Sequence, residues 1–110
     1  MDLPEEIASE LAKAEQARAR GNEGQARVCA RRAAGIAIRV YLTRKGIHPT
    51  SPSAVDLLNL LKDDPLLSPD LKLIANHLTL RVTEDFKLPM QADLIAESRT
   101  LCEILLNQRP

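Results

Sequence analysis

The chain has 110 residues with 15 basic and 15 acidic side chains, and its only aromatic residues are Tyr41 and Phe86. The balanced charge disfavours a dedicated nucleic-acid binder, which usually has a marked basic excess, and leaves room only for a local basic patch. Apolar runs are too short to cross a bilayer and the first twenty residues are charged, so we expect a single cytoplasmic domain over residues 1–110, with no membrane partner.

The first predicted element is an amphipathic helix over residues 4–20, with Pro4 in its first turn. Residues at helical spacing lie along one face of it, namely Ile7, Leu11, Ala14 and Arg18. Gly21 and Asn22 interrupt this pattern. The second and longest helix covers residues 23–45 and ends at Gly46.

The second helix has two apolar stripes. The main stripe faces the core and comprises Ala26, Cys29, Ala30, Ala33, Ile36, Ala37, Val40 and Tyr41. The thinner stripe comprises Val28, Gly35 and Leu42. A helix that is apolar on two sides is generally covered on two sides, here either by another helix of the chain or by a second subunit. Because Gly35 lets two backbones approach closely, we predict a homodimer through the thinner stripe.

Three shorter helices follow. The third begins at Pro52 with Ser51 as its cap, and the fourth spans residues 69–81 after Ser68. The predicted core residues of these two helices are Val55, Leu58, Leu61, Leu71, Ile74, Ala75 and Leu78. The fifth helix spans residues 90–107 and is expected to bury Leu94, Ile95, Ser98, Leu101, Cys102 and Leu105. No strand alternation is present, so the sequence predicts an all-α fold, a compact antiparallel bundle of about five helices.

The residues that could carry catalysis or bind a metal do not form a recognisable set. Cys29 and Cys102 lie on apolar helix faces, which favours buried free thiols over a disulfide. Two dispersed histidines and two buried cysteines do not supply the ligands of a zinc site, so no metal is expected. Known nucleotide-binding and hydrolase motifs are absent, and we predict no catalytic residue and no cofactor.

Two groups of residues are candidates for binding nucleotide or RNA phosphate. Arg32 and Arg39 are seven residues apart on one side of the second helix, and a guanidinium fork suits phosphate. His77 and Arg81 are one helical turn apart and can meet the same ligand. The alternative for the arginines is a solvated face whose stems cover apolar surface, and the alternative for His77 and Arg81 is a polar stripe at a helix end.

Residues 17–47, ARARGNEGQARVCARRAAGIAIRVYLTRKGI, resemble the core segment of HEPN domains (higher eukaryotes and prokaryotes nucleotide-binding). SAVDLLNLL from Ser53 resembles the family's His-Asp-Leu-x-x-Leu-Leu stretch, and LTLRVTEDFKLP from Leu78 resembles its Tyr-x-x-x-Arg-Tyr-Pro-Asp stretch. This resemblance implies a HEPN-like helical fold and dimerisation. It also implies a small nucleotidyltransferase as a partner, because non-catalytic members are often paired with one.

The chain departs from the family at positions that matter for activity. Gly35 and Val55 stand where the family often has Glu and His. Catalytic members are metal-independent ribonucleases that use an Arg followed four to six residues later by a His. Arg81 matches this Arg, but Lys87 stands where the most distant His would be. We therefore predict no metal-independent ribonuclease activity, because Arg81 does not release its proton and no histidine follows it.

The sequence thus predicts a non-catalytic HEPN-like helical module for association with itself or with a partner protein. Its expected nucleotide or RNA phosphate site comprises Arg81, His77, Arg32 and Arg39. Two alternatives stay open: a plain helical adaptor without a nucleotide site, and a ribonuclease with an unconventional site at Arg81.

Overall fold

The computed structural model describes residues 3–80 and 93–107, and these residues form five α-helices without any strand. The helices are α1 (Glu5–Ala19), α2 (Glu23–Arg44), α3 (Ala54–Lys62), α4 (Pro69–Thr79) and α5 (Leu94–Asn107). The all-α prediction is confirmed. No helix among the described residues is long and apolar enough to cross a membrane. Arg81, Lys87 and the predicted start of the fifth helix at Met90 lie outside the described residues.

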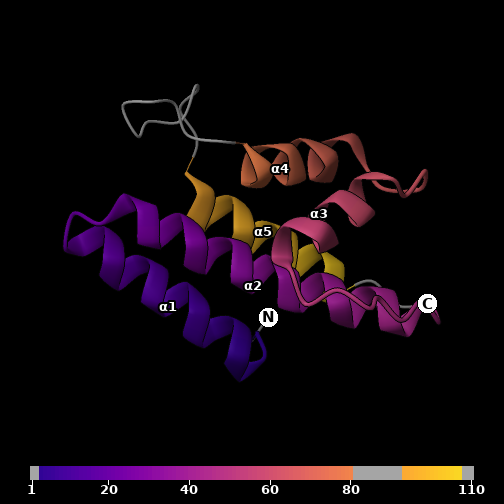
Figure 1. The fold of residues 1–110 in the computed structure, drawn as a ribbon, viewed down its shortest axis with the longest axis horizontal. Coiled ribbons are helices and arrows are strands. Elements are labelled where there is room, and N and C mark those ends of the chain that lie inside the picture. The colour runs from indigo at the N-terminus through magenta and orange to yellow at the C-terminus, as the bar shows by residue number, and fades with distance from the viewer. Residues whose placement is uncertain (1–2, 81–92, 108–110) are drawn as a thin grey trace.

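Helix α2 is the central element, because it contacts each of the other four helices. In Figure 1, α1 runs alongside α2, whereas α3 and α4 lie on the other side of α2 and α5 lies behind it. The alanine-rich middle of α2 permits close packing of α5. There, the buried Ser98 hydroxyl donates to the Ala30 carbonyl at 2.7 Å and the Cys102 thiol donates to the Ala33 carbonyl at 3.5 Å.

One hydrophobic cluster draws on all five helices, and it includes every core residue predicted for α5 except the polar Ser98, which is itself buried. Both cysteines are free and buried, which confirms the prediction made for them. Burial raises the pKa of the Cys102 thiol to about 11, because the apolar surroundings disfavour the charged thiolate. Cys102 is therefore a packing residue without nucleophilic character at neutral pH.

Side-chain caps set the beginnings of three helices. The side chains of Asn22, Ser53 and Ser68 each accept a hydrogen bond from a backbone N–H in the first turn of α2, α3 and α4. The prediction of Ser51 as the cap of the third helix was wrong. The Ser51 hydroxyl instead donates to Asp56 at 2.7 Å. Because Ser53 is the cap, the helix begins at Ala54, two residues later than expected.

Arginines of α2 stabilise the ends of two other helices. Arg31 donates to the carbonyl of Leu78, in the last turn of α4, at 2.6 Å and to that of the C-cap residue Leu80 at 3.2 Å. Arg44 donates to the Leu106 carbonyl at 2.9 Å, in the last turn of α5. Positive groups at these positions satisfy free carbonyls and complement the negative end of the helix dipole. Much of the positive charge of α2 is therefore used for packing the bundle.

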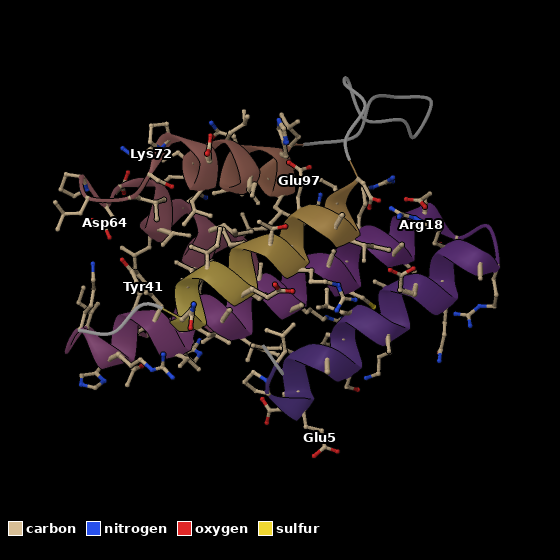
Figure 2. The ribbon with its side chains drawn as sticks, turned by 180° about the vertical axis from the view of Figure 1, so that it is seen from behind. Glu5, Arg18, Tyr41, Asp64, Lys72 and Glu97 are labelled. Atoms are coloured by element: carbon tan, nitrogen blue, oxygen red, sulfur yellow. The ribbon has the colours of Figure 1, made fainter. Side chains whose placement is uncertain are left out.

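A further polar contact joins the end of α2 to the segment between α3 and α4. Asp64 accepts hydrogen bonds from the Leu66 backbone N–H at 2.9 Å, the Tyr41 hydroxyl at 3.1 Å and the Lys45 ammonium at 3.2 Å. Figure 2 shows Tyr41 and Asp64 close together at this end of the molecule. These donors, with the Leu66 N–H first, hold the pKa of the Asp64 carboxyl below its usual range.

Several predicted faces differ in detail from the observed ones. In α1 the last buried residue is Ala17 and not Arg18, which was predicted on that face. Arg18 instead forms ion pairs with Glu23 and Asp93 at 2.6 and 2.9 Å. In α3 the first inward leucine is Leu57, and Val55, which was expected in the core, is 42% exposed.

Two further differences concern α2 and α4. Ile36 and Val40 were expected in the core but are only partly buried at its edge. Helix α4 ends at Thr79 instead of Arg81 because the backbone of Leu80 is extended.

Candidate functional site

A groove with a volume of about 730 Å³ lies over α2, between α1 and the first turn of α3. It exists because α1 packs on α2 and α5 whereas α3 packs on α2 and α4, so that these two helices do not contact each other. Figure 1 shows α1 and α3 on different sides of α2, which leaves part of the central helix uncovered. The groove is thus the place where the described part of the bundle lacks a helix.

The floor of the groove is a row of side chains on α2 with i+4 spacing. Val28, Ile36 and Val40 are its apolar members and the exposed Arg32 is its charged member, and the row turns gradually around the helix. All three apolar side chains are partly buried. The half-exposed Val55 adds an apolar side chain from the α3 wall.

Gly35 positions α3 at the edge of this floor. A Cβ atom on Gly35 would lie 3.1 Å from the Cβ and 3.3 Å from the Cα of Ala54, so the first turn of α3 uses the space that the glycine leaves. Leu42, further along the same predicted stripe, is buried in the core. Of the three residues predicted for a dimer interface, only Val28 lies at an open surface, while Gly35 and Leu42 are covered within the chain. The homodimer itself stays a prediction.

The α1 wall of the groove is acidic. Glu6 and Glu10, one turn apart, line it, and an adjoining depression of about 410 Å³ continues past Glu5 to Lys13. The Glu10 side chain is 16% exposed, and one of its oxygens is 3.7 Å from the Lys13 ammonium. Its other oxygen, Oε2, is buried without a hydrogen-bond partner among the described residues. Glu10 therefore has unused capacity to accept a hydrogen bond.

The opposite side of the groove is basic. Arg31 and Arg39 lie four residues before and after Gly35, and therefore on the side of α2 that faces α3. Arg39 donates to the carbonyls of Pro49 and Ser51 at 3.3 and 2.7 Å and so fixes the segment before α3. Arg32 is exposed on the floor and makes no hydrogen bond or ion pair with other residues in the described ranges. The groove thus has a floor of apolar side chains with one exposed arginine, an acidic wall along α1 and a basic side toward α3.

The residues predicted to bind phosphate are not gathered at one place. Arg32 and Arg39 line the groove, but His77 is only 9% exposed and lies between α4 and α5. Its Nδ1 is 2.6 Å from Glu97 Oε1, and Figure 2 shows Glu97 on the part of α5 nearest α4. Arg81 falls outside the described residues. The structure therefore does not join His77 to the arginines of the groove.

Sequence reasoning missed the acidic wall and the apolar floor as parts of one site. Their signals were present: Glu6 and Glu10 are four residues apart, Ile36 and Val40 are four residues apart, and Val28 precedes Ile36 by eight. What the sequence did not indicate was that α1 and α3 would leave this face of α2 open.

Comparisons with family models, curated proteins and solved structures found no match to this chain. The resemblance to HEPN domains therefore rests on the sequence features alone. Within residues 3–80 and 93–107, no group of three or more His, Cys, Asp or Glu side chains is placed to hold a metal ion.

Proposed function

We propose that this chain is a helical association module that binds another protein through the groove over α2. The observation that carries this proposal is the uncovered apolar floor on the central helix, formed by Val28, Ile36 and Val40. Apolar surface that is exposed to water is unfavourable in free energy, and covering it with a partner is therefore favourable. An apolar centre with polar edges is the usual arrangement of a protein-binding surface, and a groove of this kind is one mode of recognising a helix.

The groove supports protein association better than phosphate binding. Glu6 and Glu10 repel a phosphate approaching the floor. The hydrogen bonds that Arg31 and Arg39 donate to carbonyls reduce their capacity for an anion. Arg32 alone offers an uncommitted guanidinium there, and a single exposed arginine is a weak phosphate site. We therefore favour the association part of the function expected from sequence over the nucleotide-binding part.

The resemblance to non-catalytic HEPN domains is compatible with this proposal, because it implies association with a second copy or with a small nucleotidyltransferase. Either partner is a protein that covers apolar surface. The proposal requires no catalytic residue.

Site-specific photocrosslinking in the cells that make this protein tests the proposal. A photoreactive amino acid at Val55 points from the α3 wall of the groove, and the same group at Leu73 serves as the control, because Leu73 is exposed on α4 outside the groove. We expect a discrete protein adduct from position 55 that position 73 does not give and that Ile36→Arg abolishes. Adducts at both positions alike, adducts that nuclease removes, or no adduct at position 55 would contradict the proposal.

A further inference from the structure

The length of the groove floor matches a helix. Val28 and Val40 are twelve residues apart on α2, which corresponds to about 18 Å, or somewhat more than three turns. A second helix lying along α2 in this space would pack against the floor with apolar side chains at positions i, i+3 or i+4, and i+7. Its two flanks would then face α1 and the first turn of α3.

The two sides of the groove carry opposite charges and therefore favour opposite charges on the two flanks of the occupant. Toward α1 the occupant meets the carboxylates of Glu6 and Glu10. Toward α3 it meets Arg31 and Arg39. Each of these guanidiniums has two nitrogens bound to backbone carbonyls, so it attracts an acidic side chain mainly through its positive charge. Basic side chains on one flank and acidic side chains on the other would complement both walls.

The chain itself offers no such helix among its described elements. No helix there exposes more than two large apolar side chains: α3 exposes Val55 and Leu60, α4 exposes Leu73 and α5 exposes Ile104. Two copies meeting groove to groove would set one concave surface against another and leave the floor poorly packed. These features favour a different protein as the occupant.

We infer that the groove binds an amphipathic helix of a partner protein, with an apolar ridge on α2, a basic flank against α1 and an acidic flank against Arg31 and Arg39. The inference rests on the proposed function and specifies its partner. Because turning a helix end for end exchanges its two flanks, the separated charges also fix the direction in which the partner helix lies. The apolar ridge supplies most of the affinity, and the flanks supply orientation and selectivity.

The test uses helix-stabilised peptides of about 18 residues, which as helices are longer than the floor by more than one turn. The first peptide has a leucine ridge, lysines on one flank and glutamates on the other. The control peptide has the same composition and ridge, but its lysines and glutamates alternate on both flanks. Titration calorimetry is expected to show that the first peptide binds roughly tenfold more tightly, since several partly exposed charge pairs contribute modestly each.

Charge reversal of the α1 wall gives a result that misfolding does not imitate. The Glu6→Lys/Glu10→Lys variant makes both sides of the groove basic, so it is expected to prefer a peptide with glutamates on both flanks. Glu15→Lys, an exposed change on another side of α1, is expected to keep the wild-type preference.

Three outcomes would overturn the inference: equal affinities of the two peptides, no binding of either by the folded protein, or no change of preference on reversal. Sedimentation that shows a dimer of the wild type, dissolved by the same charge reversal, would also overturn it, because the groove would then hold a second copy. That last outcome leaves the proposed function intact, whereas the absence of an adduct at position 55 removes the proposed function as well.

Discussion

Replacing Gly35 with leucine is expected to lower the free energy of unfolding by about 2–3 kcal/mol, near the upper end for overpacked cores. A Cβ atom there already lies 3.1 Å from the Ala54 side chain and 3.3 Å from its backbone, closer than ordinary van der Waals contact, and leucine adds three more carbon atoms beyond it. Helix α3 must move or the side chain must adopt a strained rotamer. Urea denaturation followed by circular dichroism measures the change, and the melting temperature should fall by roughly 10 °C.

Gly24→Leu is the matched control, because it places the same side chain in the first turn of the same helix. A Cβ atom at Gly24 meets only side-chain atoms of Asn22 and Arg27, at 3.8 and 3.9 Å, and the position is exposed. Its stability should stay within about 0.5 kcal/mol of the wild type. If Gly35→Leu instead dissociated a dimer without destabilising the monomer, Gly35 would belong to an intersubunit interface after all.

Leu58→Ala is expected to destabilise the protein by about 2–5 kcal/mol, the usual range for a buried leucine whose removal leaves a cavity. Leu58 is 0% exposed and is the residue through which the middle of α3 enters the shared core. The same loss loosens the α3 wall of the groove, so the affinity for a groove ligand should fall along with stability. Thermal unfolding and peptide titration on the same sample measure both effects.

Leu66→Ala makes the same chemical change at a site that is 84% exposed. Its free energy of unfolding and its peptide affinity should both stay close to wild-type values, because little buried surface is lost. Equal effects of Leu58→Ala and Leu66→Ala would show that α3 does not pack as described.

The helical fold was predictable from sequence because local signals agreed along the chain. Apolar residues recur at helical spacing, and Asn22, Ser68 and Gly46 stand at helix boundaries as their chemistry requires. Every residue predicted for the core of α5 is buried, and Leu106 is a further buried residue that was not predicted. Errors arose where neighbouring residues compete for one role: Ser53 caps α3 instead of Ser51, and Leu57 is buried instead of Val55.

The candidate site was predictable only in part, because it depends on the relative placement of helices. Gly35 was recognised as a point of close approach, but periodicity does not indicate whether its neighbour comes from the same chain; the structure places Ala54 there. The arginines of α2 were recognised as a group, yet the carbonyls that Arg31 and Arg39 bind belong to segments ten or more residues away. Such partners depend on tertiary packing and leave no local pattern.

Methyl chemical-shift mapping tests most directly whether the groove over α2 is the protein-binding surface. The protein, with labelled isoleucine and valine methyl groups, is titrated with the peptide whose basic and acidic residues are separated on two flanks. We expect the largest methyl chemical-shift changes at Val28, Ile36, Val40 and Val55, which line the groove, and little change at Ile104 on α5. Shifts centred instead on Ile74 and Ile104, with the groove methyls unmoved, would contradict the account.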